Sequence, residues 1–265
     1  MSHVAIDHAP SGLRWLALDS PAKRNALSVE LLTELLDALD DAMASESVRA
    51  IVVTSQQDVF CSGADLKEPR PTADDGGSDP VVPPSTELFV QVLRRLHWGP
   101  KPTIVYVDGA VRGGGIGLVA AADIVVADER ASFAFSEVRL GVIPALISLP
   151  VLERMSRPDA LRYFLTGEPF GGQPAAEAGL VDIYVRSSER DAILGSIADA
   201  LALGAPSALS LAKRLVREHQ PAVGEAAWES QLWELARESA SIFVSPDAQE
   251  GIAAFRERRQ PRWTI

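Results

Sequence analysis

The chain has 265 residues and a mass of 28.4 kDa, with 47% hydrophobic and 23% charged residues, so it is long enough to bury a full core as one domain. Its formal net charge of −11 at pH 7 and isoelectric point near 4.9 argue against nucleic acid or an anionic membrane as its main partner. Cys61 is the one cysteine, which excludes an intrachain disulfide and a cysteine metal cluster.

From the sequence we expect neither a targeting signal nor a segment that spans a membrane. Residues 1–10 lack the apolar core of a signal peptide. The most apolar stretch, 116–127, is too short to span a bilayer and contains Asp123. We therefore expect a cytoplasmic enzyme or binding protein without a membrane partner.

The first part of the chain predicts a hairpin, a helix and a buried strand. Residues 4–18, with turn-forming residues at 9–12, are typical of a β-hairpin. Ser28 is suited to cap a helix whose apolar residues recur at helical spacing. These residues are Leu31, Leu32, Leu35, Leu36, Leu39 and Met43. The continuous β-branched run at 48–54 indicates a buried strand.

The middle of the chain alternates strands and helices. A stretch rich in Pro, Gly and Asp at 69–85 is the one segment that we expect to be mobile. A helix is predicted at 87–98, and buried strands are predicted at 103–107 and 124–127, around a glycine-rich turn. This alternation indicates an α/β domain with mostly parallel strands.

The last part of the chain is predicted to be helical. Four helices are expected, over 190–203, 206–219, 225–243 and 246–259. Their apolar positions exceed what one core domain is expected to cover, which favours packing on another subunit. Examples are Trp228, Leu232, Leu235, Ile242, Phe243, Ile252 and Phe255. The alternative is that these helices fold back on their own core.

Two loops of small residues have the character of an oxyanion-binding site. Gly113, Gly114 and Gly115 lack Cβ atoms and precede a predicted helix, whose N-terminal N–H groups and dipole favour negative charge. The loop at 60–66 likewise turns from a strand end into small residues. Each loop can direct one N–H group to a common point, as a thioester carbonyl requires when it becomes an enolate. The alternative for the glycines is a turn needed only for tight packing.

Glu137 is the candidate acid–base residue. It follows an apolar strand predicted at 132–135, so partial desolvation should raise its pKa and suit it to proton transfer. The alternative is a structural salt bridge to Arg139 or to another cation. We interpret two other carboxylates as structural: Asp65 as a helix cap or loop brace, and Asp123 as a hydrogen-bonded buried group.

Basic residues are clustered despite the acidic total. A ligand with several phosphates could use part of this set, although solvated helix faces explain most of it. The residues are Lys23, Arg24, Lys67, Lys213, Arg214, Arg217, Arg256, Arg258, Arg259 and Arg262. The four histidines fall in no metal or nucleophile pattern, and no serine lies on a G-x-S-x-G turn. The sequence therefore predicts neither a metal site nor a Ser–His–Asp hydrolase.

Seven short segments, spread over nearly the whole chain, form an ordered set of motifs. They are KRNALS at 23–28, FCSGADLKE at 60–68, GGG at 113–115, FSEVRLG at 135–141, LTG at 165–167, AGLV at 178–181 and EGIAAF at 250–255. Taken in this order, they resemble the crotonase, or enoyl-CoA hydratase/isomerase, superfamily nearly end to end. The sequence around the glycines and Glu137 resembles that of bacterial hydratases of branched or carboxylated enoyl-CoAs, of the methylglutaconyl-CoA hydratase type.

The resemblance implies a fold, a ligand and a set of site residues. The fold is an α/β ββα-spiral core at 1–195, with a helical region at 196–265 that forms a homotrimer or a dimer of trimers. The ligand is an acyl-CoA thioester, with no further cofactor. The oxyanion amides fall on Ala64 and Gly114. The adenine and phosphate end of the ligand is expected near Lys23, Arg24, Ala26, Asp65 and Leu66, completed by Phe255 and nearby basic residues of a neighbouring subunit.

The chain departs from the family pattern at two positions. Hydratases with two glutamates carry one of them two residues after the last glycine, where this chain has Gly117, whereas the other glutamate falls on Glu137. Many relatives also have a glycine-rich stretch after the Ile-Pro pair, where this chain continues with Ala145. Because Pro144 suits the first turn of a helix, the Ala145 amide could still hold a water or a substrate group.

These features predict an enoyl-CoA hydratase-like lyase with Glu137 as its single acid–base group. One glutamate could serve a concerted syn addition if the Ala145 N–H and another group position the water. Two alternatives stay open. The first is isomerisation of a 3-enoyl-CoA to a 2-enoyl-CoA, for which one proton-shuttling glutamate suffices. The second is an acyl-CoA-binding protein with little catalysis.

Overall fold

The computed structural model describes residues 2–9, 12–68, 81–218 and 224–264. Most of the segment predicted to be mobile, 69–85, lies outside the described residues. The elements on either side of it agree with the predictions. The hairpin, the helix that Ser28 caps and the helices after residue 190 are all confirmed, with ends that differ by at most two residues.

The described strands form two sheets. The first contains β1 (Val4–His8), β2 (Leu13–Leu18), β3 (Ala50–Ser55), β5 (Thr103–Val107), β7 (Ile124–Asp128) and β10 (Ile183–Val185), in that spatial order. The second contains β4 (Val59–Cys61), β6 (Ala110–Arg112), β8 (Ser132–Ala134) and β9 (Phe170–Gly171). Only the pairs β1–β2 and β8–β9 are antiparallel among the described ladders.

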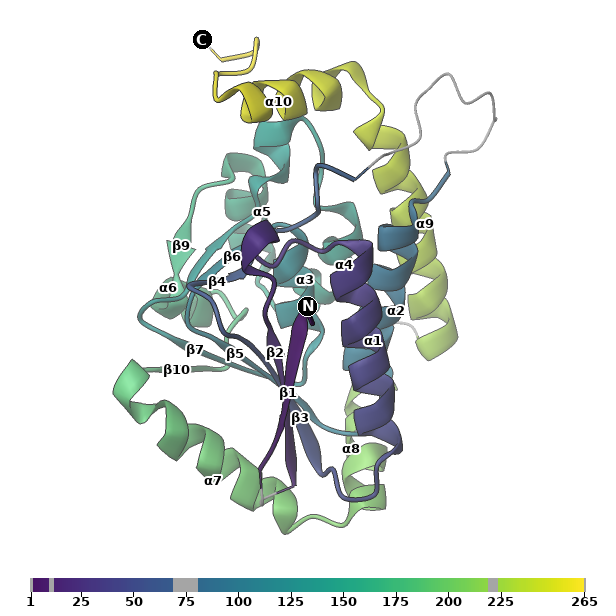
Figure 1. The fold of residues 1–265 in the computed structure, drawn as a ribbon, viewed down its shortest axis with the longest axis vertical. Coiled ribbons are helices and arrows are strands. Elements are labelled where there is room, and N and C mark those ends of the chain that lie inside the picture. Colours follow the sequence, from purple (N-terminus) through teal and green to yellow (C-terminus); the bar gives the residue numbers. More distant parts are fainter. Residues whose placement is uncertain (1, 10–11, 69–80, 219–223, 265) are drawn as a thin grey trace.

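The chain repeats one pattern that builds both sheets. A strand of the large sheet is followed by a strand of the small sheet and then by a helix, as in β3–β4–α2 (Pro84–Trp98) and β5–β6–α3 (Gly114–Ala121). The next pair, β7–β8, continues the pattern. This repeat is the ββα spiral, so the predicted fold class is confirmed (Figure 1).

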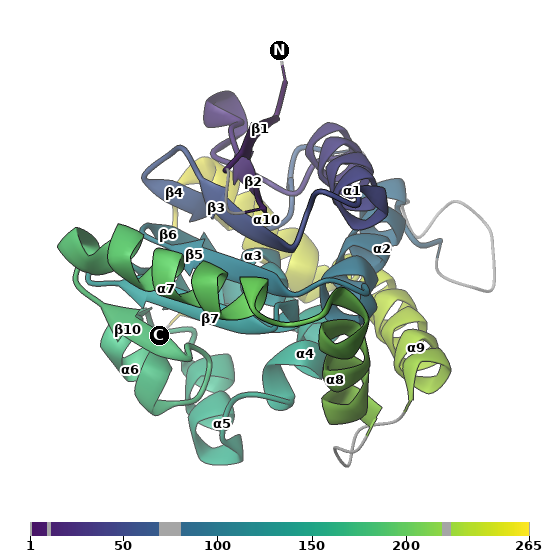
Figure 2. The same cartoon turned by 90° about the horizontal axis from the view of Figure 1, so that it is seen from below.

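The large sheet has apolar residues on both faces. One face packs against α1 (Val29–Ala44), α2 and α3 in the main core, which includes Leu35, Leu93 and Val119. The other face is covered by α7 (Arg190–Ala202), through Leu194 and Ala198 (Figure 2). The domain boundary predicted at residue 195 stays a prediction; helix α7 runs through that position.

The C-terminal helices α8 (Pro206–Glu218), α9 (Glu225–Phe243) and α10 (Pro246–Glu257) pack on this same chain. Trp228 and Leu232 of α9 are completely buried against α2 and α4 (Ala145–Leu152). The expectation that the core cannot cover these two side chains is therefore wrong. Their burial within one chain follows from the large apolar face that α2 and α4 present together.

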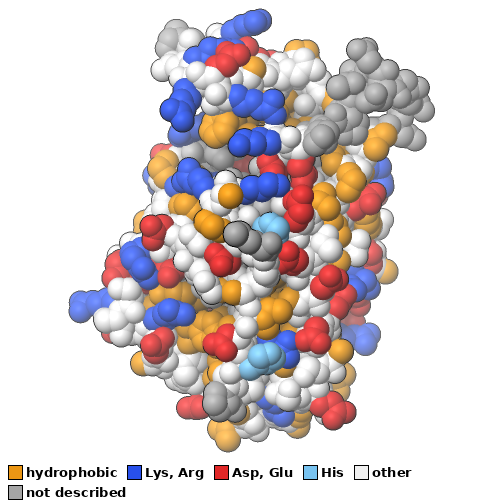
Figure 3. Space-filling view, in the orientation of Figure 1, with side chains coloured by type: hydrophobic (Ala, Val, Ile, Leu, Met, Phe, Trp, Pro, Cys, Tyr) orange, Lys and Arg blue, Asp and Glu red, His pale blue; other side chains and the backbone are white. Residues whose placement is uncertain are grey.

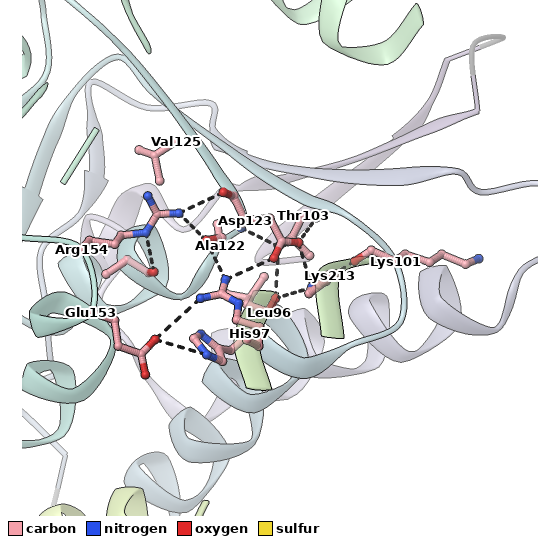
Figure 4. Close-up of polar contacts among 12 residues, drawn as sticks. Leu96, His97, Lys101, Thr103, Ala122, Asp123, Val125, Glu153, Arg154 and Lys213 are labelled. Carbon is pink, nitrogen blue, oxygen red and sulfur yellow. Dashed lines mark hydrogen bonds and ion pairs between the residues drawn. The ribbon is translucent and has the colours of Figure 1, made fainter. Parts of the chain in front are cut away.

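Helix α8 is joined to the core by a buried ion-pair network. Asp123, before β7, accepts from Lys213 at 2.8 Å, from Arg217 at 3.1 Å and from the Thr103 amide at 2.8 Å (Figure 4). Arg217 also approaches Glu153, at 3.7 Å. The structural role predicted for Asp123 is confirmed, and Lys213 and Arg217 are thereby occupied.

The remaining short elements connect these layers. They are η1 (Pro21–Lys23), η2 (Ser136–Leu140), η3 (Ser187–Glu189), α5 (Arg157–Thr166) and α6 (Gly172–Glu177).

Across the described part of the chain, no single helix is long and apolar enough to cross a membrane. One pair of segments, 187–202 and 206–218, passes the same test together by length and composition, but the pair is bent by 106° at its break.

Candidate active site

One cavity of about 750 Å³ brings the predicted site residues together. Its wall is built by η1, the loop after β4, the start of α3, η2, α4 and α10. All ten predicted residues line it: Lys23, Arg24, Ala26, Ala64, Asp65, Leu66, Gly114, Glu137, Ala145 and Phe255. The segments that carry these residues are separated by more than two hundred positions in the sequence, from Lys23 to Phe255, so only the fold makes them neighbours.

The two small-residue loops meet at one end of this cavity. Gly113 has φ +48° and donates its N–H to Ala134 O at 3.1 Å. Gly63 has φ +90°, and a Cβ on it would lie 3.1 Å from the carbonyl oxygen of Arg112. Both glycines therefore allow a left-handed turn and a close backbone approach. Within the described residues, the N–H groups of Ala64 and Gly114 have no acceptor, so both stay available to a ligand.

The turn that carries Lys23 and Arg24 is fixed to the first of these loops. Leu27 donates its N–H to Gly63 O at 2.8 Å, and Ser62 donates to Arg24 O at 3.2 Å. The buried Asn25 side chain accepts from the Ser20 amide at 2.7 Å and donates to carbonyls of β4. No role is predicted for Asn25 from the KRNALS motif; its position between two functional segments was the available signal.

Glu137 lies in η2, and its carboxyl group faces the glycine turn. A Cβ on Gly113 would lie 3.1 Å from Glu137 Oε1, which places the carboxylate beside the amide of Gly114. Burial raises the pKa of Glu137 to about 7. Its Oε2 atom is buried without a hydrogen-bond partner among the described residues. Arg139 donates instead to Thr166 O at 3.3 Å, so the alternative of a Glu137–Arg139 salt bridge is wrong.

The position where a second glutamate would stand is closed by apolar side chains. A Cβ on Gly117 would lie 2.6 Å from Ile147 Cγ2 and 3.1 Å from Phe89 Cζ. Phe89 and Ile147 themselves line the cavity, which gives it an apolar wall beside the glycine turn. Ala145 is the first residue of α4, and its N–H has no acceptor within the described part of the chain.

Several charged residues also line this cavity. Asp65 pairs with Lys23 at 3.1 Å and accepts from the Lys67 amide at 2.9 Å, which confirms its role as a loop brace. Figure 3 shows Lys and Arg side chains gathered over α10 and the segment next to it. Arg112 also lines the cavity and was missed, because a lone arginine before a glycine turn carries no periodic signal.

The residues of α10 that line the cavity belong to the same chain. Phe255, Arg256 and Arg259 all face it, and Arg256 donates to Leu66 O. The family resemblance predicts that Phe255 is supplied by a neighbouring subunit. The structure instead folds α10 over η2 of its own chain, because Gly251 permits close contact with Leu140.

Comparison with known proteins gives consistent matches. Residues 8–265 match the family model described as enoyl-CoA hydratase/isomerase. The 2,3-dehydroadipyl-CoA hydratase of Escherichia coli is 32% identical over 93% of this chain and 92% of its own length. The crystal structure of an enoyl-CoA hydratase from Mycobacterium avium has a TM-score of 0.85 at 36% identity, covering 100% of both chains. That of carnitinyl-CoA hydratase from the same organism has a TM-score of 0.81 at 30% identity, covering 100% of this chain and 99% of the other.

Proposed function

The chain belongs to the enoyl-CoA hydratase/isomerase family, and we propose that it adds water to the double bond of a 2-enoyl-CoA, or removes it, with Glu137 as its one acid–base group. The observation that carries this proposal is the juxtaposition of a buried carboxyl of raised pKa with two unpaired amides, those of Ala64 and Gly114, in one cavity. Acid–base catalysis and charge stabilisation are the two things that hydration requires.

In the proposed reaction, ionised Glu137 takes a proton from water as the water oxygen bonds to the β-carbon. The electron pair of the double bond moves to the thioester oxygen, and the enolate formed is held by the N–H groups of Ala64 and Gly114. Glu137 then returns its proton to the α-carbon and is ionised again. The unpaired N–H of Ala145 is the proposed donor that orients the water, since it lies at the start of α4 on the cavity wall.

The experiment that tests the oxyanion site replaces Gly114 by proline, which removes the N–H. Gly114 is the first residue of α3, a position that tolerates proline. Removing one such donor is expected to lower kcat by roughly 100- to 1000-fold. Gly114→Ala is the matched control, because it keeps the N–H and adds only a Cβ, which would lie 2.7 Å from the end of the Leu27 side chain. Unchanged turnover of folded Gly114→Pro would reject the proposed oxyanion site.

A second candidate function is isomerisation of a 3-enoyl-CoA to a 2-enoyl-CoA. The apolar wall of Phe89 and Ile147 at Gly117 favours it, because no second carboxylate is available there to activate water. If crotonyl-CoA or 2,3-dehydroadipyl-CoA loses the absorbance of its conjugated double bond, the protein is a hydratase. If a 3-enoyl-CoA gains that absorbance, the protein is an isomerase. Acyl-CoA binding without turnover of any of them would identify a binding protein.

A further inference from the structure

The two proposed oxyanion amides are aimed in the same way, by the carbonyl of the residue before each of them. Gly63 O and Gly113 O each accept a backbone N–H at 2.8 Å. In a planar trans peptide the N–H points opposite to the C=O. The N–H groups that follow, on Ala64 and Gly114, are therefore held in fixed directions. These hydrogen bonds do not fix how far apart the two loops stand.

The two loops follow neighbouring strands and contact each other at Gly63 and at Cys61. Strands β4 and β6 pair in parallel, with Cys61 opposite Val111. At Gly63 backbone meets backbone, because a Cβ there would lie 3.1 Å from Arg112 O. At Cys61 a side chain fills the gap: a Cβ on Gly115 would lie 2.7 Å from Cys61 Cβ and 3.0 Å from Cys61 Sγ. The Cys61 side chain thus keeps the two loops apart at this point.

Cys61 also holds the turn of its own loop. Its Sγ accepts from the N–H of Gly63, the residue before Ala64, at 3.4 Å. The side chain is completely buried and does not line the cavity. Burial raises the pKa of the thiol to about 12, so the thiol stays protonated near neutral pH and is no nucleophile. Any effect of Cys61 on the reaction therefore passes through the two loops.

We propose that Cys61 is a positioning residue of the oxyanion site, whose side chain sets the distance between the N–H groups of Ala64 and Gly114. The assignment rests on the proposed function. Both donors must lie roughly 2.7–3.1 Å from the enolate oxygen, so a change of a few tenths of an ångström in the gap alters the fit. A thiol suits this place, because it is larger than a methyl group and needs no strong hydrogen-bond partner when buried.

Two substitutions change the gap from opposite sides. Cys61→Ala removes the sulfur and the acceptor of the Gly63 N–H, and we expect kcat to fall about 10-fold. Gly115→Ala adds a Cβ against Cys61, in a helix whose backbone suits alanine, and should lower kcat by up to about 100-fold. Cys61→Ser keeps an acceptor of similar size and should recover most of the loss. Gly195→Ala is the matched control, because a Cβ there meets nothing within 4 Å; its kcat should equal that of the wild type.

The absorbance of a bound ligand separates positioning from a loss of folded protein. The probe is 4-(dimethylamino)cinnamoyl-CoA, which absorbs at longer wavelength when its thioester oxygen accepts hydrogen bonds, because these bonds stabilise the charge that moves onto this oxygen on excitation. A smaller folded fraction lowers the amplitude of this band and leaves its wavelength unchanged. We expect a shift to longer wavelength in the wild type, a smaller one in Cys61→Ala and Gly115→Ala, and recovery in Cys61→Ser. The Kd for free coenzyme A, which has no thioester oxygen, should be the same in all four proteins.

The outcomes distinguish failure of this proposal from failure of the proposed function. If Cys61→Ala and Gly115→Ala keep the wild-type wavelength, or if their affinity for free coenzyme A falls as much as kcat, Cys61 is only structural and the proposal is wrong. A wild type that shows no shift overturns the proposal together with the oxyanion site. The shift requires no turnover, so a wild type that shows it but hydrates no enoyl-CoA keeps the role of Cys61 while the proposed reaction is wrong. If Cys61→Ala does not fold, Gly115→Ala tests the same gap from the other loop.

Discussion

The carboxyl group of Glu137 is poised to change its charge close to neutral pH. In the proposed reaction the ionised form begins the cycle, and burial raises its pKa to about 7. We therefore predict that kcat/KM for hydration of crotonyl-CoA rises with pH through an apparent pKa near 7 and then levels off. Glu137→Gln should lose roughly 1000-fold or more in kcat, because no second acid–base group is proposed.

The pH–rate profile from about pH 5 to about pH 9 checks this prediction. Arg139→Gln is the companion variant, since Arg139 is a neighbour of Glu137 that does not pair with it. It should keep the same apparent pKa. A profile that is flat, or that falls as pH rises through 7, would show that ionised Glu137 does not begin the reaction.

The same burial predicts a cost in stability. Below pH 4.5 Glu137 is protonated in both the folded and the unfolded chain. Between pH 4.5 and about 7 the unfolded chain releases this proton while the folded chain keeps it, so the free energy of unfolding falls as pH rises. The total fall is about 3 kcal/mol. Glu137→Gln lacks this titration, and we predict that its stability relative to the wild type increases across the same window.

Urea unfolding of both proteins at about pH 4.5 and about pH 8 measures this difference. The comparison between the two pH values removes any constant effect of burying the glutamine amide. If the difference in unfolding free energy is the same at both pH values, the carboxyl group is not desolvated in the folded protein in solution.

Single residues of the site differed in how far the sequence could identify them. Glu137, Ala64 and Gly114 belong to motifs whose order along the chain is specific, and all three line the cavity. The sequence could not show how Gly117 is packed, because Phe89 and Ile147 come from other helices. The contact of Cys61 with the glycine turn was equally hidden, since it exists only in the folded chain.

At the scale of elements, α10 positions the catalytic segment. Gly251 in α10 packs so closely on η2 that an added Cβ would collide with the carbonyl of Leu140. Because η2 carries Glu137, we predict that Gly251→Val displaces it, lowers kcat and reduces the free energy of unfolding by about 1–3 kcal/mol. Kinetics and urea unfolding of the variant measure the two effects.

Gly195→Val is the matched control for that substitution. Gly195 also lies within a helix, α7, but a Cβ there would meet nothing within 4 Å. The same change in side chain then reports helix propensity alone, which favours valine over glycine slightly. If Gly251→Val keeps the turnover and stability of Gly195→Val, the contact between α10 and η2 does not position Glu137.

Elements with a long apolar period were predictable, and so was the short apolar strand β8, but other short strands were not. Helices α1 and α7–α10 follow from regular spacing over three or more turns, and β3, β5 and β7 follow from apolar runs. Strand β6, with only three residues, has no such period, and neither does β9. The docking of α10 on its own chain depends on a tertiary contact between Gly251 and Leu140, for which a helical pattern gives no indication.

For the molecule as a whole, the exposed apolar side chains are only partly those that the sequence suggested: Phe255 is 63% exposed, as expected. Trp228 and Leu232 are buried within the chain, but Leu161 and Leu165 of α5 are 61% and 72% exposed, and Leu211 of α8 is 64% exposed. Leu161 and Leu165 are four residues apart and share one helix face. Helix α5 also packs on η2, so a partner seated on this face would lie next to the element that carries Glu137.

We predict that the protein forms a trimer or a dimer of trimers in which this face of α5 is covered, because exposed leucine pairs are costly in water. Light scattering at micromolar concentration should give about three or six times the chain mass of 28.4 kDa. Leu165→Glu places a charge on the covered face and should shift the mass towards the monomer. Leu203→Glu is the control, since Leu203 is 91% exposed just beyond α7, away from this face. A wild-type mass near 28 kDa rejects the assembly, and an assembly that persists in Leu165→Glu places the contact elsewhere.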